Sequence, residues 1–445
     1  MNRKLHDLSP DEASTGRGGL TRRHLLRLGA AGLAGTTLAG CATVDSGKPP
    51  IGRVVVIGGG YGGATAAKYL RLWSEGSIDV TLVEPSRRFV SCPMSNLVIG
   101  GSRQIEELSI GYDGLARRGV RVVHDMASAI DAEKKQVRLA NGSSLPFDRV
   151  IVSPGVDFMF EQVPSWDAAA QETVLHAWKA GPQTVALRRQ LEAMPDGGVV
   201  VMSLPLAPYR CPPGPYERAC QIAHYIKTRK PRSKLIVLDA NPDMVSKKPL
   251  FTRVFAEDYK GIVEYRNSAN VTEVDARGRA LRTEFGDNVR GDVLNFIPPM
   301  RAGNIARDAG LVTANARWCG VDWVTMESTA VKNVHVLGDA TLSAPLMPKS
   351  GHMANQHGKS AAAAIVEIMN GRTPVPLMMA NTCYSYIDDA NAVHVASVHR
   401  YDAAQKTMVT VQGSGGLSAP DRALWKTEAD YAWGWAKTIW SDMLT

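Results

Sequence analysis

The chain of 445 residues is 44% hydrophobic and 21% charged, which is ordinary for a globular protein and leaves room for two or three domains. Its formal net charge is +8, but residues 1–41 hold six Lys or Arg and three Asp or Glu, so the rest of the chain carries only +5. Such a small excess, with no basic run interleaved with aromatic residues, argues against nucleic acid as a partner.

The first 50 residues are expected to be a twin-arginine export signal and a linker. Arg22 and Arg23 precede an uncharged stretch, 28–40, that is rich in small residues and too short to cross a bilayer as a helix. Export by this route carries folded proteins and predicts a periplasmic location. The stretch ends at Cys41 in a sequence that resembles a lipobox, so a lipid anchor on Cys41 and a product without lipid are both open alternatives.

Residues 53–70 read as a strand, a glycine turn and a helix. Gly58, Gly60 and Gly63 fit the G-x-G-x-x-G spacing, in which the glycines allow a tight turn, close approach to a pyrophosphate and close helix packing. A second predicted strand ends at Glu84, where an acid can bind a ribose hydroxyl. These elements in this order predict a dinucleotide-binding site.

Two later segments favour FAD over NAD at this site. Segment 149–155 is similar to the strand and turn that close the FAD domain of flavoproteins with two dinucleotide-binding folds, and segment 334–340 is similar to their late motif. This likeness assigns Gly155, Gly338 and Asp339 to the cofactor, with Asp339 at its ribityl or pyrophosphate part.

An α/β unit is inserted between these segments, at 165–290. It has the position of an NADH domain, but segment 203–215 replaces the glycines with prolines, which lack the N–H donors that a pyrophosphate needs. A nicotinamide donor is therefore not expected. The predicted elements are helices over 178–194 and 216–228 and strands over 199–202 and 234–239.

The C-terminal part begins near residue 374. It has a strand-like segment, 392–398, and a tryptophan-rich helical end, 424–444. We favour packing or a subunit interface for these tryptophans over a membrane-surface face, because acidic residues interrupt the segment and lysine is scarce.

The six cysteines form no C-x-x-C pair, which excludes c-type haem attachment and a zinc ribbon, and no metal site is expected. In an exported protein a disulfide can form. They are Cys41, Cys92, Cys211, Cys220, Cys319 and Cys383.

Four segments around these cysteines resemble the flavoprotein subunit of flavocytochrome c sulfide dehydrogenase (sulfide:cytochrome c oxidoreductase). They are 89–101, 210–219, 348–351 and 381–385, and the similarity runs from about residue 52 to near the C-terminus. The resemblance implies an α/β fold of glutathione-reductase type, with two Rossmann-like domains and a C-terminal α+β domain. The expected ranges are 51–164 and 291–373 for the FAD domain, 165–290 for the second domain and 374–445 for the C-terminal domain.

The resemblance also implies the chemistry. FAD would be bonded through its 8α-methyl group to Cys92, and Cys211 and Cys383 would form a redox-active disulfide beside it. Sulfide or polysulfide would be the substrate, oxidised to zero-valent sulfur or polysulfide, and a separate c-type cytochrome subunit would take the electrons in a heterodimer.

The order of attack is not written in the sequence. We favour Cys383 on the substrate side and Cys211, preset by two prolines, on the flavin side. Lys349, near the expected N-terminus of a helix that points at the flavin, is predicted as a catalytic residue whose positive charge lowers the thiolate pKa and stabilises reduced flavin. Two alternatives stay open: a sulfide:quinone oxidoreductase at the membrane and a non-catalytic flavoprotein subunit.

Overall fold

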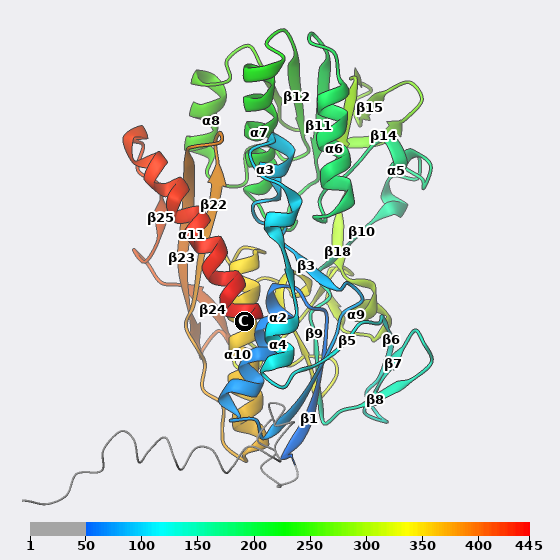
Figure 1. Cartoon of the computed structure of the whole chain (residues 1–445), viewed down its shortest axis with the longest axis vertical. Coiled ribbons are helices and arrows are strands. Elements are labelled where there is room, and N and C mark those ends of the chain that lie inside the picture. Colours follow the sequence, from blue (N-terminus) through cyan, green and yellow to red (C-terminus); the bar gives the residue numbers. More distant parts are fainter. Residues whose placement is uncertain (1–49) are drawn as a thin grey trace, which may run out of the picture. The chain divides into compact units, whose positions relative to one another are not determined.

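The computed structural model describes residues 50–445, and segment 1–49, with the predicted export signal and Cys41, lies outside the described residues. The described part contains two parallel sheets with helices and a C-terminal antiparallel sheet with one long helix (Figure 1). The predicted α/β class with two Rossmann-like domains is confirmed. Across residues 50–445 no helix is both long and apolar enough to cross a membrane.

The first domain is built on a parallel sheet in the order β21-β9-β1-β2-β5. Its central strands are Val- and Ile-rich and buried, as expected for a parallel sheet covered by helices. A Cβ on Gly358 would lie 2.5 Å from the carbonyl oxygen of Gly62, so the close crossing of helices α2 (Tyr61–Trp73) and α10 (Gly351–Met369) requires glycine. The strands are β1 (Gly52–Ile57), β2 (Ile78–Val83), β5 (Arg121–Val123), β9 (Arg149–Val152) and β21 (Val334–Val336).

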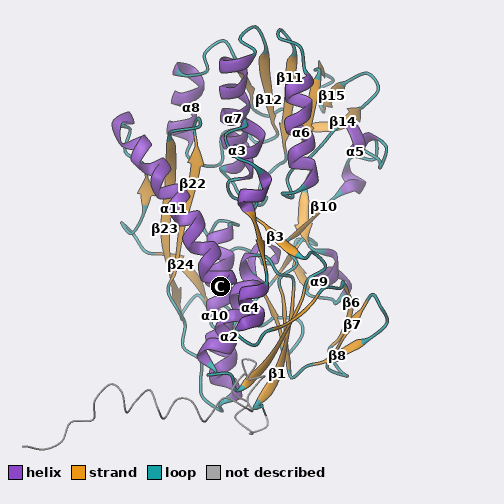
Figure 2. Cartoon of the chain, in the orientation of Figure 1, coloured by secondary structure: helices purple, strands orange, loops and turns teal. Residues whose placement is uncertain are grey.

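The central domain is built on a second parallel sheet, in the order β13-β12-β11-β17, and Figure 2 shows helices beside its strands. Three predicted elements are present in it, with ends that differ by at most two residues. The elements are β11 (Val199–Leu204), β12 (Lys234–Asp239), β13 (Val263–Arg266), β17 (Val293–Phe296), α6 (Pro182–Ala193) and α7 (Gly214–Arg229).

Two predicted boundaries in the central domain are wrong. Strand β17 pairs in parallel with β11, so this domain continues past residue 290 and takes one more strand before the chain returns to the first sheet. The helix predicted from residue 178 begins only at Pro182, because Gly181 has a φ of 141° and proline favours the first helical position.

The C-terminal domain consists of the strands β22 (Met379–Tyr386), β23 (Ala392–Asp402), β24 (Thr407–Thr410) and β25 (Gly416–Leu417), and helix α11 (Trp425–Leu444). Figure 1 shows α11 running along β22 and β23. Trp425 and Trp440 are buried, and the indole nitrogen of Trp440 donates to the hydroxyl of Tyr61, 3.0 Å away. These two tryptophans therefore pack inside the protein, as favoured from the sequence.

Shorter elements connect these units. The helices and turns are α3 (Ser95–Gly100), α4 (Asp113–Arg117), α5 (Ala170–Thr173), α8 (Lys248–Glu257), α9 (Asn304–Asp308), η1 (Ile105–Leu108), η2 (Phe160–Gln162), η3 (Gly338–Ala340) and η4 (Arg422–Leu424). The strands are β3 (Arg88–Val90), β4 (Ser109–Gly111), β6 (Ala127–Asp131), β7 (Gln136–Leu139), β8 (Ser144–Pro146), β10 (Val156–Phe158), β14 (Val271–Asp275), β15 (Ala280–Thr283), β16 (Asn288–Arg290), β18 (Met300–Ala302), β19 (Val312–Ala314) and β20 (Trp318–Cys319).

Candidate functional site

All three domains contribute walls to a cavity of about 840 Å³. A volume of this order suits a cofactor or a drug-sized ligand. Gly63 and Lys349 do not line the cavity, although both were predicted site residues. The predicted residues that do line it are Gly58, Gly60, Glu84, Cys92, Gly155, Cys211, Gly338, Asp339 and Cys383.

The glycine turn after β1 has the geometry of a dinucleotide cradle. Gly58 has a φ of 95°, and a Cβ there would lie 2.3 Å from the carbonyl oxygen of Ser153. A Cβ on Gly63 would lie 1.9 Å from the carbonyl oxygen of Gly58, so Gly63 serves helix–strand packing and not ligand contact. A Cβ on Gly60 would meet nothing within 4 Å, and the start of α2 lines the cavity beside it. The positive end of this helix therefore faces the space that a phosphate would fill.

Glu84 follows β2 and its carboxylate is fixed by two backbone donors. The amide of Gly59 donates to one carboxylate oxygen at 2.8 Å, and the amide of Ser86 donates to the other at 2.8 Å. Each oxygen keeps a lone pair for another donor, which is what recognition of a ribose hydroxyl needs.

Asp339 has a buried side-chain oxygen that a bound molecule could satisfy. Its Oδ1 atom is buried and has no hydrogen-bond partner among the described residues. The indole nitrogen of Trp178 is also buried without a partner there. Burial raises the pKa of the Asp339 carboxyl above its usual range. Both side chains line the cavity, so a bound molecule with hydroxyl and acceptor groups would satisfy them. Together with the glycine turn and Glu84, these residues fit FAD.

Cys92 lies between β3 and α3, and its thiol faces both the cavity and the loop before α6. The backbone amide of Ala180 donates to its sulfur at 3.5 Å, and the sulfur lies 3.9 Å from the carbonyl oxygen of Trp178. The sulfur thus has a fixed position in the cavity wall, which is a requirement for attaching a cofactor in one orientation.

Cys211 is held in a strained turn before α7. Its φ is 60°, its amide donates to the carbonyl oxygen of Lys349 at 2.8 Å, and its own carbonyl accepts from the amide of Gly214 at 2.9 Å. A Cβ on Gly214 would lie 2.7 Å from the Cys211 sulfur, so glycine there gives the thiol its space.

Cys383 lies on β22, where the amide nitrogen of Asn381 contacts its sulfur at 3.4 Å. Cys211 and Cys383 are both free thiols in this structure. Burial is the main cause that raises the pKa of each thiol, and charge on Cys383 would raise the pKa of Cys211 further. Both cysteines line the same cavity.

The predicted role of Lys349 stays a prediction, because the structure shows only where its ammonium is bonded. Its ammonium donates to the carbonyl oxygens of Asp339, at 3.0 Å, and Thr341, and lies 3.8 Å from the ring centre of Trp318. Burial lowers its pKa to about 8. Lys349 does not line the cavity, and its hydrogen bond to Cys211 is made by its backbone carbonyl.

The charges near the cysteines come from residues that sequence reasoning missed. Arg210 and Arg218 line the cavity, and Lys247 is buried behind it. Burial lowers the pKa of Lys247 to about 8, whereas negative charge on Cys383, Glu217 or Cys211 would raise it. Arg210 stands next to Cys211 in the sequence and could have been found there, but nothing near Lys247 in the sequence signals its position.

In the central domain, the acid at the position where a nucleotide ribose would bind is hydrogen-bonded by the protein's own side chains. Asp239, at the end of β12, is buried and its Oδ2 accepts from the hydroxyls of Tyr216 and Tyr265, each at 2.8 Å. Its Oδ1 accepts from the amide and side chain of Asn241 at 2.9 and 2.7 Å. The acid that would bind a ribose is thus saturated, which agrees with the prolines of the preceding loop. Among residues 50–445 no group of three or more His, Cys, Asp or Glu side chains could hold a metal ion.

Three family models match separate parts of the chain. Residues 52–193 match the pyridine nucleotide-disulphide oxidoreductase family. Residues 184–298 match the central part of the sulfide dehydrogenase [flavocytochrome c] flavoprotein chain, and residues 375–444 match the flavin-binding part of flavocytochrome c sulphide dehydrogenase.

Among curated proteins, the flavoprotein chain of sulfide dehydrogenase [flavocytochrome c] from Chlorobaculum thiosulfatiphilum is 65% identical over 46 residues, covering 10% of this chain and 94% of that sequence. The mitochondrial sulfide:quinone oxidoreductase of Dictyostelium discoideum is 22% identical over 334 residues, covering 73% of this chain and 72% of the other.

Solved structures agree on the fold. The sulfide:quinone oxidoreductase of Aquifex aeolicus superposes with a TM-score of 0.68 at 19% identity, covering 88% of this chain and 91% of that one. A putidaredoxin reductase complex with putidaredoxin gives a TM-score of 0.63 at 16% identity, covering 86% and 93%. These two likenesses support the fold with two Rossmann-like domains and a C-terminal domain.

Proposed function

Because this chain belongs to the family of flavoprotein chains of flavocytochrome c sulfide dehydrogenase, we propose that it oxidises sulfide to zero-valent sulfur or polysulfide and passes the electrons to a c-type cytochrome subunit. Membership makes it a flavoprotein oxidoreductase. The substrate, the sulfur product and the partner are proposals for this chain.

The observation that carries the proposal is the meeting of three cysteines on one cavity. Cys92 comes from the first domain, Cys211 from the central domain and Cys383 from the C-terminal domain. These cysteines are far apart in the sequence, so it is the fold that brings them to one cavity. Two other cysteines, Cys220 and Cys319, are buried and do not line the cavity.

In the proposed chemistry Cys211 and Cys383 begin as a disulfide. The sulfur of hydrosulfide forms a bond to one of them, the bond between the cysteines breaks, and the other cysteine leaves as a thiolate. Sulfide loses two electrons and the disulfide gains them. Hydrosulfide is already anionic near neutral pH, so the step needs no strong general base.

FAD, when bound, supplies a two-electron acceptor that can release electrons one at a time to a haem partner. Gly58, Gly60 and Glu84 would hold its nucleotide part, and Asp339 would meet its ribityl or pyrophosphate part. We propose that Cys92 bonds it covalently, which would prevent its loss after export.

Location follows from the same proposal. Segment 1–49, which is outside the described residues, would direct export by the twin-arginine route to the periplasm. That compartment has no nicotinamide pool, so a diffusible inorganic sulfur donor makes chemical sense. The saturated Asp239 and the proline-rich loop before α7 support an enzyme that does not depend on NADH.

The test is to reduce the purified holoprotein with sulfide and then offer either a soluble c-type cytochrome or a short-chain quinone. Fast reoxidation by the cytochrome alone is the expected result. Preference for quinone would favour the rival function, which the likeness to sulfide:quinone oxidoreductases makes the nearest alternative. If sulfide never bleaches the flavin, the chain is a non-catalytic flavoprotein.

A further inference from the structure

Lys247 is a buried lysine beside the cysteines that belongs to none of the sequence motifs. It precedes helix α8, and only 4% of it is exposed. Its ammonium donates to the hydroxyl of Ser385 at 2.8 Å and to the carbonyl oxygen of Val393 at 3.1 Å, both in the C-terminal domain. Both acceptors are neutral, and within residues 50–445 these are its hydrogen-bond partners. Its charge is therefore buried without a bonded counter-ion, which costs free energy unless an anion lies nearby.

The strand geometry brings Lys247 to Cys383. Side chains alternate along a strand, so Asn381, Cys383 and Ser385 share one buried face of β22. Asn381 contacts the Cys383 sulfur through its amide nitrogen, and Lys247 bonds to Ser385 on the other side of that sulfur. On this face Cys383 is therefore flanked by a residue that contacts its sulfur and by a residue that accepts from the Lys247 ammonium.

The buried charges around the cysteines are not balanced while both sulfurs are neutral. Glu217, Arg218 and Lys247 are at least nine-tenths buried and together would carry one net positive charge. Glu217 accepts from the amide of Tyr386 and the side chain of Asn96, each at 2.8 Å, so its bonded partners are also neutral. One sulfur anion would bring the sum to zero.

Arg218, within this cluster, donates to neutral oxygens, including the carbonyl of His176 at 2.8 Å. Two further charged groups, Arg210 and Glu428, leave the net charge positive. Arg210 adds positive charge at the cavity wall. Glu428, on α11, is already bonded at 2.8 Å to His394 and accepts from Ser418 at 2.5 Å.

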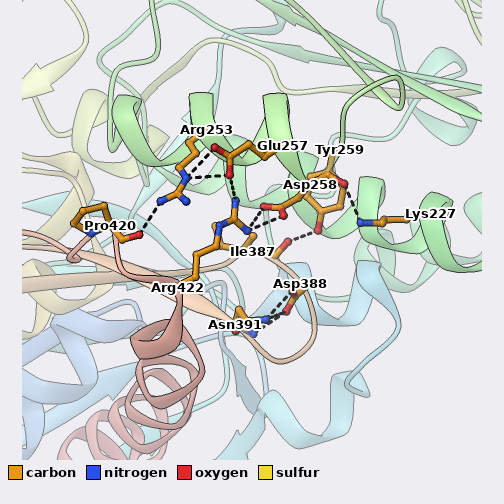
Figure 3. A network of polar contacts seen from close by, with 10 residues as sticks. All are labelled: Lys227, Arg253, Glu257, Asp258, Tyr259, Ile387, Asp388, Asn391, Pro420 and Arg422. Carbon is orange, nitrogen blue, oxygen red and sulfur yellow. Dashed lines mark hydrogen bonds and ion pairs between the residues drawn. The ribbon is translucent and has the colours of Figure 1, made fainter.

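The far end of α8 is tied to the C-terminal domain by the contacts that Figure 3 shows. Arg422 donates to both carboxylate oxygens of Asp258, at 2.7 and 2.8 Å, and to Glu257 at 2.9 Å. The hydroxyl of Tyr259 donates to the carbonyl oxygen of Ile387 at 2.6 Å. The helix that follows Lys247 is therefore held against the same hairpin that carries Cys383.

We propose that Lys247 is a positioning residue that keeps one sulfur of the opened Cys211–Cys383 pair in its anionic form. The inference rests on the proposed function, because it requires these cysteines to cycle between disulfide and dithiol. On reduction, two electrons from the reductant break the sulfur–sulfur bond, one sulfur takes up a proton, and the other stays an anion beside Lys247. The same charge stabilises the thiolate that hydrosulfide releases.

The test measures this equilibrium without sulfide. Holoprotein is poised in dithiothreitol redox buffers from about pH 6.5 to 9, quenched in acid and alkylated, and the Cys211–Cys383 bridge is counted by mass spectrometry. Reduction of the parent near pH 7, below the pKa of about 8 that burial gives the Lys247 ammonium, should take up about one proton, and reduction of Lys247→Met about two. At that pH the variant disulfide should be about tenfold harder to reduce, which corresponds to about 30 mV.

Two further variants separate charge from packing. Lys247→Arg keeps the charge and should behave like the parent. Lys68→Met removes another buried lysine that donates to backbone carbonyls, those of Ser441 and Asp442, and does not line the cavity; it should also match the parent. Equal proton uptake in Lys247→Met and the parent overturns the proposal, as does a shift in Lys247→Arg as large as that in Lys247→Met.

The parent protein alone also decides the matter if Lys247→Met loses its flavin or fails to fold. Uptake of two protons across the whole pH range would overturn the proposal without any variant. Failure of the proposed function would look different: the bridge would form and titrate with dithiothreitol, yet sulfide would not reduce the flavin. If no Cys211–Cys383 bridge forms at any potential, both proposals are wrong.

Discussion

Cys211 combines an unfavourable backbone conformation with a tight neighbourhood. Its φ of 60° is uncommon outside glycine, and Gly214 leaves its sulfur little spare room. Strain of this kind persists only where the surroundings impose it, and here the carbonyl of Lys349 and the prolines after Cys211 do so. The turn thus holds one thiol in one place, as a sulfur that must meet both a substrate and a flavin requires.

Serine variants of the two cavity cysteines test the sulfur chemistry directly. Cys211→Ser and Cys383→Ser should keep bound flavin and accept electrons from dithionite, but their reduction by sulfide should fall on the order of 100-fold or more, since the disulfide is gone. Stopped-flow absorbance of the flavin measures the rate.

Cys220→Ala is the matched control, because it removes a buried thiol on α7 that does not line the cavity. It should bleach at the parent rate. Parent-like bleaching in either serine variant would instead mean that sulfide reduces the flavin without help from the cysteines.

Covalent attachment at Cys92 has a simple readout. Acid precipitation should carry the yellow colour into the pellet for the parent, because the bond survives denaturation. In Cys92→Ala the colour should move to the supernatant while the native variant still binds flavin through the glycine turn and Glu84. Colour released from the parent would refute the attachment.

Residues differ in how well the sequence predicted them. Cys92, Cys211 and Cys383 stand in recognisable segments, and the structure places all three on one cavity. Lys349 also stands in such a segment, but the direction of a long side chain depends on tertiary contacts, and here its ammonium donates to two backbone carbonyls. Lys247 reaches Ser385 across 138 residues of sequence, so no local pattern could reveal it.

Among the elements, α8 has the clearest energetic test. One guanidinium nitrogen of Arg422 donates to both carboxylate oxygens of Asp258, and 34% of the Arg422 side chain is exposed (Figure 3). Arg422→Ala should lower the free energy of unfolding by about 1 kcal/mol, measured by urea denaturation of the holoprotein.

Arg307→Ala is the control for this prediction. Arg307 forms an exposed pair with its neighbour Asp308, so its loss should change the unfolding free energy by less than about 0.5 kcal/mol. A loss in Arg422→Ala no larger than that in Arg307→Ala would contradict an anchoring role for Arg422.

Element boundaries show where sequence reasoning ended. Hydrophobic periodicity located β12 at Lys234–Asp239 without error, because a buried parallel strand leaves a continuous apolar run. The start of α6 was missed because Gly181 and Pro182 act on backbone conformation and not on hydrophobic pattern. Strand β17 was assigned to the wrong domain, since sheet membership depends on pairing between distant segments.

At the scale of the whole molecule, the proposed site is complete only when three domains meet. Each contributes one cysteine, and a two-electron flavin without a haem of its own needs an external acceptor. We expect a heterodimer with a c-type cytochrome, detected by co-purification and by cytochrome-dependent reoxidation of the reduced flavin. A chain that always elutes alone, and whose flavin is never reoxidised faster by cytochrome c, would contradict this.

The four hydrogen bonds that saturate Asp239 have a physiological consequence. In reductases with two nucleotide-binding folds, the second fold couples the flavin to the metabolic state of the cell through the ratio of NADH to NAD. In this chain two tyrosines and an asparagine donate to the acid that would bind the ribose of NADH, so we expect no such coupling. We expect the turnover rate of this flavin to be independent of the ratio of NADH to NAD. It should depend only on the supply of reduced sulfur and on the capacity of the respiratory chain.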